Sequence, residues 1–131
     1  MVLWCRRHLR RRFEVHCSER VIVALDFATA LQAIGLVKQL GDPASHYKVG
    51  LQLLTAAGPS VVRELVTMGK QVFLDLKLFE IPNSAFDQVR TDTPAGAMRA
   101  GATHIVVGRS IICADNPADA FAAVCDQLCD E

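Results

Sequence analysis

The sequence predicts an α/β protein built from parallel strands, and three observations support this prediction. Short apolar runs start near residues 21, 46 and 71, a spacing of about 25 residues that suits one strand-plus-helix unit. Segments with the helical spacing of apolar residues separate these runs. Each run ends on or near a charged residue. Because ligands bind at the carboxyl ends of parallel strands, this pattern predicts a site at one rim of the sheet.

The first predicted unit begins with Val21–Asp26, an apolar strand that ends in a carboxylate. Thr29–Leu40 then has helical spacing, and Gly41 is a stop signal. The predicted inward stripe of this helix consists of Ala30, Leu31, Ile34, Val37 and Leu40.

The second unit begins with a short strand, Tyr47–Gly50, which carries Lys48 near its end. Gly58 and Pro59 open a helix, since proline is favourable in a first turn, and Gly69 ends it. The predicted inward face of this helix consists of Val61, Val62, Leu65 and Val66.

The third strand leads into a cluster of charged side chains. Val72–Leu74 is an apolar run typical of a strand that is covered on both faces. Asp75 and Lys77 follow two residues apart, so both side chains project from the same side of the strand. Glu80 and Pro82 come next. The pattern fits either a functional site or a surface salt-bridge cluster.

The C-terminal part repeats the pattern. Thr93 and Pro94 begin a short helix that stops at Gly101, and His104–Gly108 is the next strand. Gly108, followed by an arginine and a serine, offers backbone N–H groups and a guanidinium that suit a phosphate dianion. A last helix starts at Asn116–Pro117, and its predicted inward residues are Ala120, Phe121, Val124 and Leu128.

Composition limits the class of protein. A chain of 131 residues with 51% hydrophobic residues predicts one folded domain, and no run is long enough to span a membrane. Five cysteines without a CxxC pair predict a reducing compartment and no disulfide scaffold. Cys125 and Cys129 have helical spacing and are predicted to be buried helix positions. They do not predict a metal site, because the four histidines are scattered singly.

Residues 1–20 form a basic region with six Arg and two Glu. The favoured interpretation is a loosely ordered extension without a role of its own. A transit peptide and a nucleic-acid-binding arm remain alternatives, and a secretory signal is not expected because a long apolar segment is missing.

Over roughly residues 21–129, the chain resembles the orotidine 5'-phosphate decarboxylase family. The segment VFLDLKLFEIPNS, at 72–84, is similar to the family signature D-x-K-x-x-D-I-P-N-T. Further family-like segments follow in the expected order: Val23–Asp26, Tyr47–Gly50, Asp87–Arg90, Thr93–Pro94 and Val106–Ile111. Glu80 stands where the family has Asp, and Phe79 and Ser84 replace His and Thr.

The resemblance implies a TIM (β/α)₈ barrel, a fold that takes about 200 residues or more. About four strands are expected here, because the chain passes from Ala85 almost directly to Asp87, and the family's strands four to seven are missing between them. The expected organisation is a partial barrel domain at 21–131 after the extension at 1–20. Its open inner face and free edges predict self-association, as a homodimer or a larger assembly.

The resemblance also implies roles for individual residues. Asp75 would lie against the substrate carboxylate, Lys77 would donate the proton, and Glu80 would reach the partner subunit's site. The implied catalytic residues are Lys48, Asp75, Lys77 and Glu80. The implied substrate-binding residues are Asp26, Lys48, Ser84, Gln88, Gly108 and Arg109.

The implied function is decarboxylation of orotidine 5'-monophosphate to UMP in pyrimidine biosynthesis. No metal or cofactor is expected, the expected location is cytoplasmic, and the expected partners are the nucleotide and further copies of the chain, without membrane or nucleic acid. Three alternatives remain: an inactive shortened family member that acts through association, another phosphosugar lyase, and a nucleic-acid binder that uses the Arg-rich region.

Overall fold

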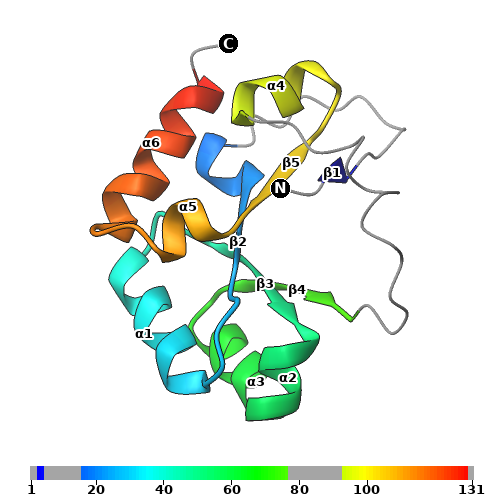
Figure 1. Cartoon of the computed structure of the whole chain (residues 1–131), viewed down its shortest axis with the longest axis vertical. Coiled ribbons are helices and arrows are strands. Elements are labelled where there is room, and N and C mark those ends of the chain that lie inside the picture. Colours follow the sequence, from blue (N-terminus) through cyan, green and yellow to red (C-terminus); the bar gives the residue numbers. More distant parts are fainter. Residues whose placement is uncertain (1–2, 5–15, 77–92, 130–131) are drawn as a thin grey trace.

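The computed structural model of the chain describes residues 3–4, 16–76 and 93–129 (Figure 1). The described strands are β1 (Leu3–Trp4), β2 (Val21–Ala24), β3 (His46–Gly50), β4 (Gln71–Asp75) and β5 (His104–Val107). The described helices are η1 (Cys17–Arg20), α1 (Ala30–Leu40), α2 (Leu51–Ala57), α3 (Ser60–Thr67), α4 (Pro94–Arg99), α5 (Arg109–Ile112) and α6 (Pro117–Cys129).

One sheet organises the fold, with the strand order β1-β5-β2-β3-β4. The four strands from β5 to β4 are parallel, and β1 runs antiparallel to β5. This confirms the prediction of an α/β protein with parallel strands. The strand that comes last in the sequence, β5, lies beside β2 and not beside β4. The first and last strands of a closed barrel are neighbours in the same way, so the described sheet is an incomplete barrel that is open between β4 and β5.

The helix boundaries follow the start and stop signals in the sequence. The Thr29 hydroxyl accepts a hydrogen bond from the backbone N–H of Gln32 at 3.3 Å, which caps α1. The Thr93 hydroxyl accepts one from Gly96 at 3.0 Å, which caps α4. Gly41 follows α1 with a φ of 69°, a conformation that glycine adopts without the steric cost of a Cβ.

The core lies between one face of the sheet and the helices (Figure 1). The sheet contributes side chains that alternate with those of the opposite face: Val21, Val23, Tyr47, Val49, Ile105 and Val107. The helices contribute Ala33, Ile34, Leu36, Val37, Leu40, Leu53, Val61, Leu65, Phe121, Val124 and Leu128. Each fully buried aliphatic side chain contributes about 1.5–3 kcal/mol, so this layer supplies most of the driving force for folding.

Two of the predicted inward side chains are in fact exposed. Leu31 is 85% exposed and Val66 is 59% exposed. With about 100° of rotation per residue, Leu31 lies on the side of α1 opposite Ala33 and Val37. Val66 is likewise rotated by about 100° from Leu65, which faces the core. The predicted stripes were therefore too wide by one position in each helix.

The prediction that the Val72–Leu74 strand is covered on both faces was wrong. Phe73 and Leu74, on opposite faces of β4, are 45% and 46% exposed. The reason is topological, because β4 is the last strand in the sheet order and has no further neighbour among the described residues. An apolar strand at a sheet edge exposes side chains that a central strand would bury.

The cysteines also differ from the prediction. Cys17 and Cys129 form a disulfide that joins η1 to the C-terminal end of α6. Cys129 is thus not a buried helix position, and Cys125 is only partly buried where it packs against the core. η1 and β1 both fall within the region 1–20, and β1 pairs with β5. In the described part of the chain, no helix is long and apolar enough to cross a membrane.

Candidate functional site

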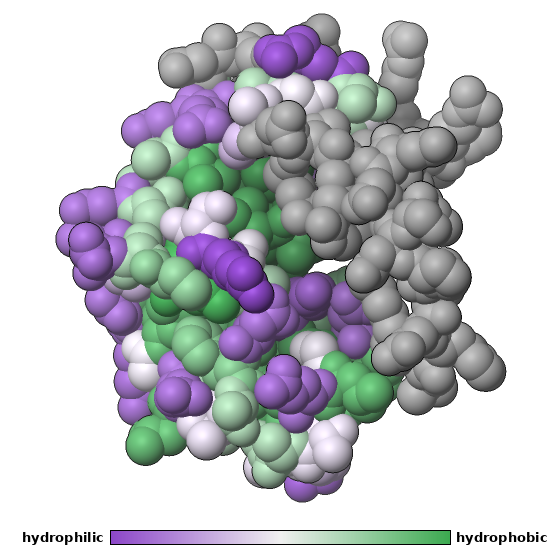
Figure 2. Space-filling view, in the orientation of Figure 1, coloured by the Kyte–Doolittle hydropathy of each residue, from purple (hydrophilic) through white to green (hydrophobic). Residues whose placement is uncertain are grey.

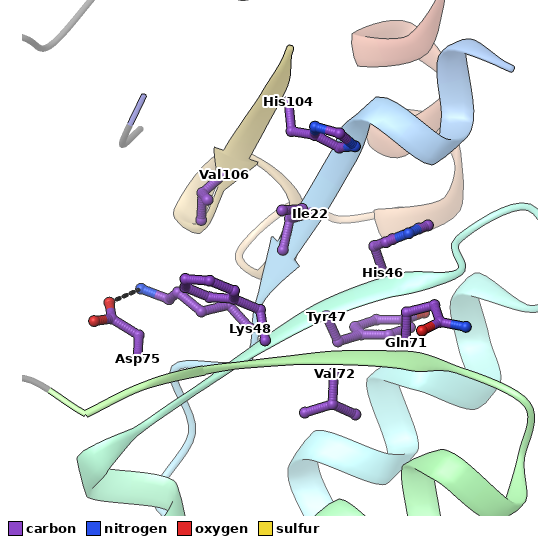
Figure 3. A pocket seen from close by; sticks show the side chains of 10 residues that line it. Ile22, His46, Tyr47, Lys48, Gln71, Val72, Asp75, His104 and Val106 are labelled. Carbon is purple, nitrogen blue, oxygen red and sulfur yellow. Dashed lines mark hydrogen bonds and ion pairs between the residues drawn. The ribbon is translucent and has the colours of Figure 1, made fainter. Parts of the chain in front are cut away.

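The C-terminal ends of the strands bring an acid and a base from β3 and β4 together. Lys48 Nζ donates a hydrogen bond to Asp75 Oδ2 at 3.3 Å (Figure 3). The parallel register pairs Lys48 with Phe73, so Asp75 is two residues further along β4 and projects from the same face. The two side chains are only 15% and 19% exposed. This partial burial strengthens their attraction relative to a pair in open water.

A second contact forms at the same rim between β2 and β5. A Cβ atom placed on Gly108 would lie 3.6 Å from Asp26 Oδ2 and 3.8 Å from Ala24 Cβ. These are ordinary van der Waals distances, so the backbone after β5 lies directly beside the Asp26 carboxylate. Arg109 follows at the start of α5 and is exposed.

The backbone between these two contacts is held by a hydrogen bond. The N–H of Leu25, one residue before Asp26, donates to the carbonyl of Lys48 at 2.9 Å. Asp26, Asp75, Gly108 and Arg109 thus lie at or just beyond the carboxyl ends of their strands, as the sequence predicted, and Lys48 lies two residues before the end of β3. The other predicted site residues, Lys77, Glu80, Ser84 and Gln88, lie outside the described residues.

A pocket of about 340 Å³ lies on the face of the sheet that the helices leave uncovered (Figure 3). Its lining residues are Ile22, His46, Tyr47, Lys48, Gln71, Val72, Phe73, Asp75, His104 and Val106. The space-filling view shows hydrophobic side chains within the visible face, with hydrophilic ones along its left edge and also across its middle (Figure 2). The Lys48–Asp75 pair lines this pocket at the end nearest the carboxyl ends of β3 and β4.

Two histidines lie at the opposite end of the pocket, and the sequence analysis did not place them together. The rings of His46 and His104 are 6.3 Å apart between centroids, on either side of Ile22 (Figure 3). His46 Nδ1 is 2.8 Å from Ser45 Oγ, and His104 Nδ1 is 3.0 Å from Thr103 Oγ1. The sequence does indicate the position of one of them, because His46 precedes Lys48 by two residues and so shares its face of β3.

Burial lowers the pKa of His104, and the nearby positive charges of His46 and Arg20 lower it further. This end of the pocket therefore carries basic groups that repel one another. Within the described ranges, no three or more His, Cys, Asp or Glu side chains converge in an arrangement that can hold a metal ion.

The fold and the rim define the class of this protein: a parallel βα-barrel protein whose opposed charges lie at the carboxyl ends of neighbouring strands. The family model of the orotidine 5'-phosphate decarboxylase / HUMPS family matches residues 19–91, which is more than half of the chain. The chain belongs to this family.

Curated relatives agree with this assignment. The chain is 46% identical to the orotidine 5'-phosphate decarboxylase of Syntrophomonas wolfei over 70 residues, which are 53% of this chain and 29% of that protein. It is 38% identical to that of Nitrosospira multiformis over 95 residues, which are 72% of this chain and 39% of that protein. The chain thus spans about a third of the length of the curated relatives it matches.

Solved structures show the same fold. The orotidine 5'-phosphate decarboxylase from Pyrococcus horikoshii OT3 matches with a TM-score of 0.68 at 19% identity, over 82% of this chain and 98% of that chain. The one from Lactobacillus acidophilus matches with a TM-score of 0.67 at 20% identity, over the same shares of the two chains. These matches confirm the predicted barrel type, with the barrel incomplete in this chain.

Proposed function

We propose that this chain decarboxylates orotidine 5'-monophosphate to UMP, the last step of pyrimidine nucleotide synthesis. The observation that carries the proposal is the Lys48–Asp75 ion pair at 3.3 Å on the rim of the sheet. The pair belongs to the residues that the family resemblance identifies as catalytic, and it borders a pocket that is open to solvent. Membership of the family supplies the reaction class.

In the proposed reaction, the bond between the pyrimidine ring and its carboxylate breaks, and CO₂ leaves. The electron pair of that bond stays on the ring carbon, and a proton from the Lys77 ammonium forms the new C–H bond. A fixed ammonium stabilises the negative charge as it develops, which is electrostatic stabilisation of the transition state. The role of Lys77 rests on the family signature.

The Lys48–Asp75 pair would act on the substrate in two ways. The Asp75 carboxylate lies against the substrate carboxylate and favours its departure, while the Lys48 ammonium holds Asp75 in place and contacts the ribose. Asp26 binds the ribose hydroxyls from the neighbouring strand. Binding energy from the distant phosphate, at Gln88, Gly108 and Arg109, helps to hold the reacting end in position.

The proposal includes self-association, because the described half of a barrel leaves the pocket open on one side. In a homodimer or larger assembly, Glu80 and Ser84 reach the partner subunit's site, and a second chain shields the exposed side chains of β4. We place the protein in the cytoplasm, and its partners are the nucleotide and copies of itself.

Turnover of orotidine 5'-monophosphate by the purified full chain tests the proposal, with UMP formation and CO₂ release measured together. Lys77→Ala should lower the rate by about a thousandfold, which is within the range for loss of a proton donor. The matched control is Lys38→Ala, because Lys38 is an exposed lysine on α1, away from the pocket. This variant should keep the parent rate.

Equal rates in the parent and in Lys77→Ala would show that a contaminating enzyme carries the activity. A folded parent, verified by circular dichroism, that gives no turnover would reject the proposal. It would favour the inactive family member, for which the exposed β4 edge is the supporting observation. That member would act only through association.

A further inference from the structure

The N-terminal end of the pocket carries a group of basic side chains that the decarboxylation does not use. His46 and His104 line the pocket there, and Arg20 is the last residue of η1, directly before β2. The register pairs Val21 of β2 with Ile105 of β5, and Arg20 and His104 are the residues directly before them in the sequence. Ile105 points into the core, so alternation along β5 directs His104 to the opposite, pocket side. Arg20, in η1, lies close enough to His104 for its positive charge to lower the pKa of that histidine.

This group is separate from the rim that contains Lys48 and Asp75. His46 precedes Lys48 by two residues, a rise of about 7 Å along the strand. Asp75 is paired in register with Gly50, which is two residues beyond Lys48, so Asp75 lies about another 7 Å further along the sheet. Among the described lining residues Asp75 is the one carboxylate, so no described acid lines the His46–His104 end.

We propose that the pocket binds a small aromatic carboxylate whose anionic group lies at His46 and His104, close to the positive charge of Arg20. Its ring lies against Ile22 and Val106, which are in neighbouring positions on β2 and β5 (Figure 3).

The chemistry of the pocket selects this class of ligand. A guanidinium and two imidazoles donate hydrogen bonds to a carboxylate and supply positive charge, whereas a metal cation would be repelled by Arg20. Phe73 also lines the pocket and offers an aromatic face to a planar ring. A few polar groups at one end of an otherwise apolar pocket are typical of small-molecule sites.

The proposal sets the direction of the pH dependence. The charged groups that act on His104 are His46 on β3 and Arg20 on η1, and both, with burial, lower the pKa of His104. A bound carboxylate offsets this repulsion and favours the protonated form of His104. Binding therefore tightens as the pH falls through the histidine range, independently of any decarboxylase activity.

The test uses 3-phenylpropionate as the probe and 3-phenylpropanol as its neutral counterpart, with the full chain. NMR titrations follow the Cε1–H resonances of the histidines. The acid should shift the resonances of His46 and His104, and its affinity should fall about tenfold between about pH 6 and about pH 8. The alcohol should bind with an affinity that does not change with pH.

Variants locate the anionic group. His104→Gln and Arg20→Gln should each weaken the binding of 3-phenylpropionate about fivefold at about pH 6, because each removes about one charge-assisted interaction. His16→Gln is the matched control, because His16 is exposed and does not line the pocket. Circular dichroism verifies folding, and Arg20→Gln decides the matter if His104→Gln does not fold.

Three results would overturn the proposal. One is equal affinity for the acid and the alcohol, which would mean that no basic group contacts the carboxylate. Another is an unchanged affinity in the variants. The third is loss of 3-phenylpropionate binding in Lys48→Met, which would place the bound carboxylate beside Lys48 and Asp75.

Discussion

Cys17 and Cys129 are joined by a disulfide, with their Cα atoms 6.0 Å apart and 112 residues apart in the sequence. The bridge ties the short helix before β2 to the last residue of α6. It therefore closes nearly the whole described fold into one covalent loop.

Cys17→Ser should lower the free energy of unfolding by about 2–4 kcal/mol, because the bridge limits the freedom of the unfolded chain. Urea denaturation of oxidised protein measures the loss. Cys113→Ser is the control, since Cys113 is an exposed free thiol. If a reductant lowers the stability of the parent but not of Cys17→Ser, the effect belongs to this bridge. Equal stability of the oxidised parent and Cys17→Ser would contradict a stabilising bridge between Cys17 and Cys129.

The two described free thiols should differ in reactivity. Burial raises the pKa of the Cys125 thiol, and the nearby Asp126 carboxylate raises it further, so less of the reactive thiolate is present. Cys113 is exposed. Under non-reducing conditions iodoacetamide should label Cys113 faster than Cys125, as peptide mass spectrometry with time will show. Faster labelling of Cys125 would contradict the packing of α6 against the core.

Two glycines provide a matched pair of substitutions. Gly35 lies on the exposed side of α1, and an added Cβ would meet no atom within 4 Å. Gly35→Ala should therefore raise the free energy of unfolding by about 0.5–1 kcal/mol. Gly108→Leu places a larger side chain beside Asp26 Oδ2 and should lower turnover more than it lowers stability. Urea midpoints measure the change in stability and turnover rates measure the change in activity. An unchanged turnover rate in Gly108→Leu would show that Gly108 is not part of the site.

Acid should destabilise the protein through His104. Its pKa is lower in the folded state than in the unfolded state, where it is about 6.5. The unfolded chain therefore binds more protons, so stability is fully present above about pH 6.5 and is lost as the pH falls through that range. Urea midpoints at about pH 7.5 and about pH 5.5 should differ less in His104→Gln than in the parent. The exposed His16, replaced in the same way, should leave the difference unchanged.

The edge of β4 should control self-association. Leu74 is 46% exposed on a strand without a described outer neighbour, and a lysine there opposes edge-to-edge pairing. Sedimentation should show a larger assembly for the parent and a smaller one for Leu74→Lys. Leu31→Lys is the control, because Leu31 is 85% exposed on α1, away from the sheet edge. A parent that sediments as a single monomeric species would contradict the expectation.

The sequence predicted the parallel strands and most helix ends well, because these depend on local patterns. Short apolar runs marked β2, β3 and β5, and capping residues such as Thr29 and Thr93 marked where helices start. α2 and α5 were not predicted, since helices of seven and four residues are too short to show a period. The exposure of Phe73 was missed because a central and an edge strand share the same composition.

Contacts between distant residues limited the prediction of the site. The charged strand ends were placed correctly on one rim, since parallel strands necessarily align their carboxyl ends. The His46–His104 pair and the Cys17–Cys129 bridge depend on β5 returning beside β2 and on α6 lying against η1, respectively. Neither neighbour relation can be read from spacing along the chain. The roles of Lys77 and Glu80 stay predictions.

Because β5 lies beside β2, further strand–helix units can be added after β4 without separating these two strands. Strand–helix units inserted between residues 76 and 93 would add to the outer edge of β4 and would leave the three parallel pairings in place. The first new strand would cover Phe73 and Leu74, and the last would compete with β1 for the outer edge of β5. Adding units one at a time and measuring turnover would therefore show how many strands a single chain of this family needs for activity without a partner chain.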